Sequence, residues 1–208
     1  MNKLTLDNVA KRFGRRILFR KLSCAVEGGQ ALAITGANGS GKSTLLKIIA
    51  GVMTPTKGDV DLELSGEKVL PPDRPLRTGF VSPYLNVYDG FSARENLEFI
   101  ARARRLSLAG QTIDDLIALV TLKGREHDLV KTYSSGMKQR VKFAAAMLTK
   151  PDVLILDEPT TNLDAAGIAM VRTVMDMQRS RNGILILASN NVDEAAWCNA
   201  SVNIEDHR

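Results

Sequence analysis

A glycine-rich segment carries the clearest chemistry in the sequence. Residues 36–44 read GANGSGKST and fit the pattern G-x-x-x-x-G-K-[ST] of loops that bind phosphate groups. Glycines let backbone N–H groups approach an anion closely, and the helix expected to follow presents its positive end to the same anion. Lys42 can reach the β- and γ-phosphates of a nucleotide, and the Ser43 hydroxyl can bind Mg²⁺. The predicted nucleotide-binding residues of this loop are Gly36, Ala37, Asn38, Gly39, Ser40, Gly41, Lys42, Ser43 and Thr44.

Two adjacent acids supply a second chemical group. The apolar run Val153–Leu156 leads directly into Asp157 and Glu158. A buried strand that ends in carboxylates delivers charge to the edge of a parallel sheet, where ligands of such sheets bind. We predict that Asp157 holds Mg²⁺, directly or through water, and that Glu158 orients and deprotonates the attacking water. Taken alone, the segment fits a strand that ends in a solvated turn. The phosphate-binding loop is what favours catalysis.

A third motif lies between the loop and the acids. The segment Tyr133–Arg140 (YSSGMKQR) predicts the start of a helix, with Ser134 or Ser135 as its N-cap. The order of loop, helical stretch, this motif, acid pair and Pro159–Asp164 (PTTNLD) resembles the ABC ATPase family over nearly the whole chain. Residues 134–137 match the family's serine-glycine-glycine-glutamine signature, with substitutions at the second and fourth positions.

The resemblance implies ATP and Mg²⁺ as ligands and a head-to-tail pair of cassettes, either a homodimer or a dimer with another ABC subunit. The Ser134 hydroxyl and the Gly136 N–H of one chain would then cap the γ-phosphate held by the partner. Phe13 matches the position of the aromatic residue that stacks on adenine, although a core phenylalanine is the alternative. The family resemblance also implies a transmembrane permease subunit as partner and a cytoplasmic location at the inner face of the membrane.

Two positions depart from the family pattern. Pro83 stands where the family has a glutamine, and Asn86 is the candidate to replace it. Asn190 stands where the family usually has a histidine after a strand. Its amide can donate a hydrogen bond to a γ-phosphate but cannot carry a charge, and we predict that it is a catalytic stand-in. Both changes affect the expected rate of turnover rather than the binding of nucleotide.

The elements that must position these groups follow from hydrophobic patterns. Short apolar runs that alternate with helical stretches predict an α/β fold with a mainly parallel sheet. Leu4, Leu6 and Val9 predict an early edge strand, Gln30–Thr35 a buried strand, and Lys42–Ala50 a helix with Gly51 as C-cap. A second half-exposed strand is predicted at residues 60–64.

Residues 91–149 read as a helical insert that opens with a capping box formed by Ser92 and Glu95. Together with the resemblance, these patterns give a P-loop NTPase core with an N-terminal antiparallel β subdomain. We predict one domain over residues 1–208, with the core and β subdomain in residues 1–90 and 150–208.

Composition is ordinary for a soluble globular protein, with 208 residues and a net charge of +5. No apolar stretch approaches the roughly 20 residues that a membrane span needs. Cys24 and Cys198 fit no metal-binding spacing, and we expect them to be free buried thiols. A basic cluster near the start, Lys11–Lys21, is either a solvated surface or a face for an anionic partner.

Three functions compete. The first is the ATPase motor of a membrane transporter. Because the chain also resembles short exporter subunits, including haem exporters, and ends soon after Ser201–Glu205, export is the expected direction. The second is a soluble ABC ATPase acting on nucleic acid or ribosomes, which is unfavoured because the stretch between Lys42 and Ser134 leaves no room for a long coiled coil. The third is a weakly active regulatory module.

Overall fold

The computed structural model describes residues 1–107 and 110–208 of the chain. The strands are β1 (Lys3–Phe13), β2 (Arg16–Glu27), β3 (Ala31–Thr35), β4 (Lys57–Leu64), β5 (Glu67–Val69), β6 (Thr78–Val81), β7 (Val153–Asp157), β8 (Ile184–Ala188) and β9 (Ala200–Asn203). The α-helices are α1 (Lys42–Ile49), α2 (Arg74–Arg77), α3 (Ala93–Ala103), α4 (Gly110–Leu119), α5 (Ser135–Met147), α6 (Ala165–Ser180) and α7 (Val192–Ala195). Short 3₁₀ turns are η1 (Pro71–Asp73), η2 (Val130–Thr132) and η3 (Ile204–His207).

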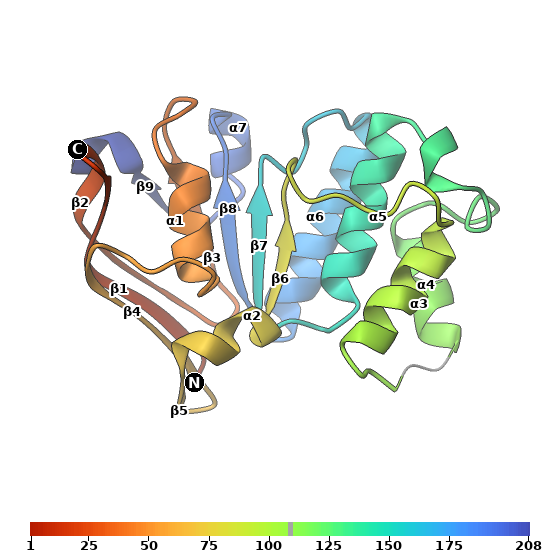
Figure 1. Ribbon diagram of the computed structural model, residues 1–208, viewed down its shortest axis with the longest axis horizontal. Helices are drawn as coiled ribbons and strands as arrows, with labels where there is room; N and C mark the ends of the chain where they lie inside the picture. The colour runs from red at the N-terminus through yellow and green to blue at the C-terminus, as the bar shows by residue number, and fades with distance from the viewer. Residues whose placement is uncertain (108–109) are drawn as a thin grey trace.

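The strands form two sheets that lie on either side of α1 (Figure 1). One is antiparallel with the order β2-β1-β4-β5, and the other is parallel with the order β6-β7-β8-β3-β9. In Figure 1 α5 and α6 follow on the far side of the parallel sheet, and α3 and α4 lie beyond them. This arrangement confirms the predicted α/β class with a mainly parallel sheet and an N-terminal antiparallel sheet.

Both faces of the parallel sheet are buried, which explains the continuous apolar runs of its central strands. Val153 and Ile155 of β7 join the core that contains α1 and the antiparallel sheet. Leu154 and Leu156 point the other way, into the core formed with α3, α4, α5 and α6. Alternate residues of one strand therefore belong to two cores, and the strand's carboxyl end is held from both sides.

The helix that follows the phosphate-binding loop ends as the sequence predicted, within one residue. Ala50 is the C-cap of α1, and Gly51 follows it in the left-handed region with φ 79°. The Gly51 N–H donates to the Ile48 carbonyl at 3.1 Å, and the Val52 N–H donates to Lys47 at 3.0 Å. This pair of bonds is the Schellman arrangement, which glycine allows because it has no Cβ.

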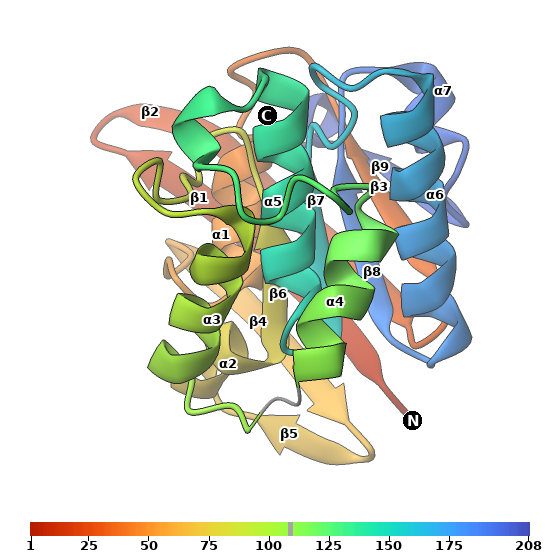
Figure 2. The ribbon, with the colours of Figure 1, turned by 90° about the vertical axis from the view of Figure 1, so that its right-hand side faces the viewer.

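The helices α3, α4 and α5 pack against one another beside the parallel sheet (Figure 2). Helix α3 begins at the predicted capping box, in which the Ser92 hydroxyl accepts from the Glu95 N–H and the Glu95 carboxylate accepts from the Ser92 N–H. Helix α5 has Ser134 as its N-cap. The division into a core and an insert at residues 91–149 stays our proposal.

One prediction about the sheets is wrong. The strand that contains Leu4, Leu6 and Val9 is not an edge strand, because β1 pairs with β2 on one side and β4 on the other. The alternation of apolar and polar residues in β1 indicates that one face of the strand is buried. It does not indicate how many strands pair with β1. The pattern of β2 was not recognised, since polar residues interrupt its apolar positions.

None of the helices in the described part of the chain combines the length and the apolar character that a membrane-spanning helix needs.

Candidate functional site

The phosphate-binding loop connects β3 to α1, and glycine conformations shape it. Gly36 adopts φ 140°, and a Cβ added there would lie 2.8 Å from Cγ2 of Ile204. Gly39 adopts φ 77° with no atom within 4 Å of its added Cβ, so this side of the loop is open. Only glycine accommodates both requirements, a close approach at one point and a left-handed turn at another. The loop therefore curls over an open space at the start of α1.

Lys42 is buried and fixed by the loop that precedes it. Its Nζ atom donates to the carbonyls of Gly36 at 2.8 Å and Ala37 at 3.3 Å. The same nitrogen lies 3.5 Å from Oε1 of Glu158. The cation is thus held at the mouth of the loop, within reach of the two acids that end β7.

The acids Asp157 and Glu158 stand at the carboxyl end of β7, as the sequence predicted. Asp157 is buried, and the Ser82 hydroxyl lies 3.5 Å from its Oδ2 atom. Glu158 adopts φ 49°, in the left-handed region, while its N–H donates to the Ala188 carbonyl at 2.8 Å. The strand ends at Asp157, directly before this residue, because the chain turns away from the sheet at Glu158.

Burial raises the pKa of both acids. It raises the pKa of the Asp157 carboxyl, while a hydrogen bond with Ser43, the charge of Lys42 and a hydrogen bond with Ser82 oppose the rise. Burial also raises the pKa of Glu158, Lys42 opposes this, and the carboxylate of Glu194 adds to the rise. A bound cation would favour the ionised form of either group.

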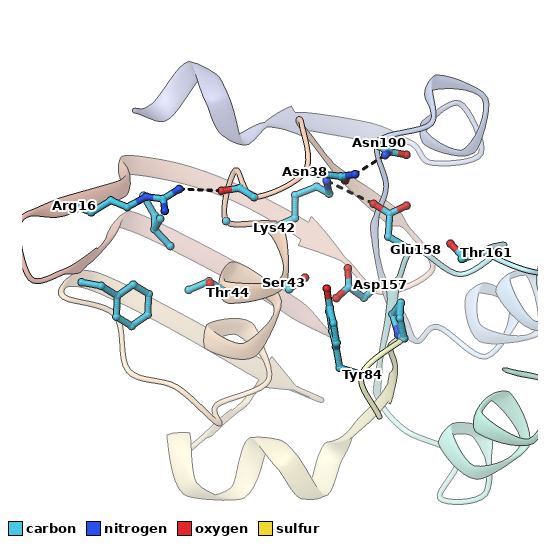
Figure 3. Close-up of a pocket in the computed structure, with 15 residues that line it drawn as sticks. Arg16, Asn38, Lys42, Ser43, Thr44, Tyr84, Asp157, Glu158, Thr161 and Asn190 are labelled. Atoms are coloured by element: carbon cyan, nitrogen blue, oxygen red, sulfur yellow. Dashed lines mark hydrogen bonds and ion pairs between the residues drawn. The ribbon is translucent and has the colours of Figure 1, made fainter. Parts of the chain in front are cut away.

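These groups surround a cavity of about 790 Å³ (Figure 3). The figure shows Lys42 and Ser43 on the side of the loop that faces Asp157 and Glu158. The lining residues of the cavity are Phe13, Arg16, Leu18, Asn38, Gly39, Gly41, Lys42, Ser43, Thr44, Pro83, Tyr84, Asp157, Glu158, Thr161 and Asn190. Three predicted loop residues, Gly36, Ala37 and Ser40, do not line it.

These three residues of the loop are in contact with other parts of the chain or buried. The Ser40 hydroxyl is buried and has no hydrogen-bond partner among the described residues. The Ala37 N–H donates to the Glu205 carboxylate at 3.0 Å, and its carbonyl accepts from Lys42. The backbone of Gly36 and Ala37 thus supports Lys42 from outside the cavity.

Asn190 comes to the same edge of the sheet, as predicted. It follows β8, which pairs with β7 so that Asp157 lies beside Ala188. Its Nδ2 atom donates to Oδ1 of Asn38 at 3.3 Å, as Figure 3 shows. The amide therefore contacts the phosphate-binding loop directly and shares the cavity with Glu158.

The family's glutamine, at the position of Pro83, is replaced less well than the family's histidine, at the position of Asn190. Pro83 lines the cavity, but it has no side-chain donor to contribute. Asn86, the predicted substitute, lines a neighbouring cavity of about 540 Å³ and not the first one. In this conformation the amide of Asn86 does not reach the space between Ser43 and Asp157.

Phe13 lines the cavity and is 51% exposed, which excludes a core phenylalanine. The Nζ atom of Lys11 lies 5.1 Å from its ring centroid. Arg16 from the same hairpin donates to the Gly39 carbonyl at 3.5 Å. One residue of the basic cluster is thereby part of the cavity wall, beside an exposed aromatic face.

The signature residues Ser134 and Gly136 do not reach this cavity within one chain. They line a separate cavity of about 410 Å³ at the start of α5. The Ser134 hydroxyl accepts from the Met137 N–H at 3.2 Å. A Cβ at Gly136 would lie 2.7 Å from the Asn162 carbonyl, so the helix start fits only because this residue is glycine.

Sequence reasoning missed several residues at the site. Arg16, Leu18 and Tyr84 line the cavity without belonging to a recognised motif, and Thr161 lines it from within the PTTNLD motif without an assigned role. Ser82, which contacts Asp157, follows β6 at the same sheet edge as the acids. The position of Ser82 directly after an apolar strand was the available signal, since the ends of parallel strands meet at one edge.

The comparisons with known proteins agree with this geometry. The model of the ABC transporter family matches residues 19–161. The uncharacterized ABC transporter ATP-binding protein YhcH of Bacillus subtilis (strain 168) is 34% identical over 191 residues, which cover 91% of this chain and 62% of that protein. The chain therefore spans less than two thirds of that relative's length.

A relative of similar length also matches. The cytochrome c biogenesis ATP-binding export protein CcmA of Haemophilus influenzae (strain ATCC 51907 / DSM 11121 / KW20 / Rd) is 35% identical over 195 residues, covering 91% of this chain and 89% of CcmA. Among solved structures, the dimeric post-hydrolysis state of the ATP-binding cassette MJ0796 bound to ADP and Pi superimposes with a TM-score of 0.82. That match has 21% identity and covers 97% of this chain and 94% of the other, and it establishes the P-loop NTPase fold. The chain belongs to the ABC transporter family of ATP-binding proteins.

Proposed function

We propose that this chain binds Mg·ATP in the cavity in front of α1 and hydrolyses it to drive a membrane transporter. The observation that carries the proposal is the convergence of Lys42, Asp157 and Glu158 on one cavity of about 790 Å³. A cation, a buried acid and a second acid are the parts that phosphoryl transfer requires, because this chemistry depends on positioning and charge stabilisation.

Each residue has a distinct role in the proposal. Lys42 and the loop backbone hold the β- and γ-phosphates, and the exposed ring of Phe13 stacks on the adenine. Ser43 and Asp157 would hold Mg²⁺. They fit this ion because a hydroxyl and a carboxylate supply oxygen ligands, and the two side chains line the same cavity. When bound, Mg²⁺ supplies charge neutralisation for the phosphates.

Glu158 is the proposed general base. Its carboxylate faces the cavity beside Lys42, and burial raises its pKa, which makes it a stronger proton acceptor once ionised. Asn190 would hold the γ-phosphate through its amide, in the place of the family's histidine.

The site is completed by a second cassette, either another copy or a paired ABC subunit. Ser134 and Gly136 lie at the N-terminus of α5, where backbone N–H groups and the helix dipole favour an anion. Since they line a different cavity from Lys42, they can contact the same nucleotide only across a dimer. Head-to-tail pairing would form two shared sites.

A transmembrane subunit is the proposed partner for transport. Tyr88, Phe91 and Phe99, which we call the aromatic cluster, are exposed and in mutual ring contact, with centroids 5.0–6.0 Å apart. Buried Asn96 holds the cluster's loop by accepting from the Tyr88 N–H at 2.8 Å and donating to the Tyr88 carbonyl at 3.0 Å. An ordered apolar patch of this kind fits an interface. The chain would then work at the inner face of the membrane.

Export is the proposed direction, supported by the similarity to CcmA over nearly the full length of both proteins. A weakly active regulatory module is the second candidate, and it is favoured by Pro83 and Asn190, which replace two polar groups of the family site. Nucleic acid is not a proposed partner.

Calorimetric titration with ATP tests the proposal at its first step. We expect binding in the presence of Mg²⁺ that weakens at least about tenfold when EDTA removes the ion. Steady-state phosphate release then separates the two candidates, since a regulatory module binds Mg·ATP without turnover. Absence of ATP binding under both conditions would contradict the proposal.

A further inference from the structure

A buried carboxylate lies next to the proposed site and has no part in the roles assigned so far. Glu194, on the short helix α7, is only 4% exposed and does not line the nucleotide cavity. The Thr160 hydroxyl donates a hydrogen bond to its Oε1 atom. Its Oε2 atom is buried without a hydrogen-bond partner among the described residues. Burying an acid with one partner costs free energy, so stability alone does not explain this residue.

The hydrogen bond joins two segments that carry proposed catalytic groups. Thr160 lies in the turn that follows β7, two residues after Glu158, and this turn is closed by a bond from the Thr161 N–H to the Glu158 carbonyl at 3.3 Å. Glu194 lies four residues after Asn190, in the segment that follows β8. The contact between Thr160 and Glu194 therefore ties the base to the segment that carries the amide.

The backbone of Glu158 needs such support. A residue other than glycine at φ 49° is held in a sparsely populated region and persists only where surrounding contacts determine it. One such contact is the bond from the Glu158 N–H to the Ala188 carbonyl at 2.8 Å. The bond between Thr160 and Glu194 is another such contact, made two residues further along the turn.

We propose that Glu194 is a positioning residue, which acts through Thr160 to hold the turn after β7 so that the Glu158 carboxylate faces the cavity. Its catalytic consequence rests on the proposed ATP hydrolysis, while the positioning itself does not. The side chain touches neither the cavity nor the loop, so its removal should affect orientation rather than the affinity for nucleotide.

Two substitutions separate the hydrogen bond from the bulk of the side chain. Glu194→Met removes the acceptor and keeps an apolar side chain of similar length, whereas Glu194→Gln keeps an oxygen that can accept from Thr160. Thr160→Val removes the donor. Asp193→Asn is the matched control, because Asp193 is an exposed acid on the same helix.

We expect Glu194→Met to lower kcat at least about tenfold, equivalent to roughly 1.4 kcal/mol of barrier, with ATP affinity within about twofold and no decrease in Tm. Glu194→Gln should stay within about threefold of the wild-type kcat. Thr160→Val should have the same effect as Glu194→Met. The double variant that combines these two substitutions should be no slower than either single variant, because each substitution removes the same hydrogen bond. The Asp193→Asn control should match the wild type.

A readout that is independent of turnover completes the test. Hydrogen exchange at the Glu158 amide should be faster in Glu194→Met than in the wild type without nucleotide, since the turn has lost one of the contacts that hold it. If exchange is unchanged, or if Tm and ATP affinity fall together with kcat, Glu194 is not a positioning residue. A wild-type chain that hydrolyses no ATP would contradict the proposed function, and the exchange rates would still decide the role of Glu194.

Discussion

The Nζ atom of Lys42 and the Oε1 atom of Glu158 lie 3.5 Å apart, so the cation of the phosphate-binding loop pairs with the proposed base. Lys42 is buried, and within the described part of the chain its nitrogen contacts this carboxylate and two backbone carbonyls. A phosphate group entering the loop would compete with Glu158 for the ammonium group. Binding of nucleotide would thereby release the carboxylate to face the attacking water.

Lys42→Ala should abolish ATP binding or turnover while the fold is retained, because Lys42 is the only side-chain cation of the loop and the loop is shaped by backbone. Calorimetry with ATP, with circular dichroism as the check on folding, measures this. Lys47→Ala is the control, since Lys47 is an exposed lysine on the same helix. Unchanged affinity in a folded Lys42→Ala variant would show that the loop holds phosphate without its lysine.

Asp157→Asn should raise the Tm of the nucleotide-free chain and remove the effect of Mg²⁺ on ATP affinity. Burial raises the pKa of Asp157, so the folded state loses stability as pH rises through the ordinary carboxyl range, and a neutral amide avoids this cost. The gain in Tm should therefore be larger at pH 7 than at pH 4. Thermal melts at both pH values and ATP titrations with and without Mg²⁺ measure the two effects. A variant with a lower Tm at pH 7, or one that keeps the full effect of Mg²⁺, would contradict the assigned role.

Asn190→Ala should lower steady-state ATP hydrolysis at least about tenfold, equivalent to roughly 1.4 kcal/mol of barrier, because its amide is the proposed contact to the γ-phosphate. Asn190→His should keep or raise the rate, since histidine restores the family's side chain. The measurement is the rate of phosphate release at saturating Mg·ATP for the wild type, Asn190→Ala and Asn190→His, with dimer formation checked in parallel. If the alanine variant is as fast as the wild type, Asn190 has no catalytic part and Asn191 becomes the candidate.

Charged substitutions in the aromatic cluster should release the proposed transmembrane partner and spare basal hydrolysis. Tyr88→Glu and Phe91→Glu place charge on an exposed patch whose neighbours are aromatic rings. The measurement is recovery of a multi-spanning membrane protein with the tagged chain from detergent extracts. Leu70→Glu is the control, because Leu70 is another exposed apolar residue outside the cluster. A complex that survives both cluster substitutions would place the interface elsewhere.

The sequence predicted the parts of the site that depend on local order. Apolar strands followed by glycines or acids could be read directly, and the structure places Lys42, Asp157 and Glu158 around one cavity. The capping residues Ser92 and Ser134 were also predictable, since a cap is determined by neighbours in sequence.

What the sequence did not reveal depends on contacts between distant segments. The pairing of β1 with both β2 and β4 could not be read from the alternation in β1 alone. Glu205 contacts the Ala37 N–H, and Glu194 contacts Thr160, across long separations in sequence that leave no local signal. The position of Asn86 outside the nucleotide cavity is set by the path of the loop after Pro83, which no periodic pattern describes.

ATP hydrolysis by the wild-type chain and by Glu158→Gln tests the central claim most directly. We expect measurable phosphate release from the wild type and a loss of at least about 10²-fold in Glu158→Gln, which removes the base and keeps Asp157. The variant should still bind Mg·ATP and should shift towards dimer in gel filtration with Mg·ATP but not with ADP. Glu67→Gln, an exposed glutamate on β5, should behave as the wild type. A Glu158→Gln variant that hydrolyses ATP at the wild-type rate, or a wild-type chain with no hydrolysis, would contradict the account.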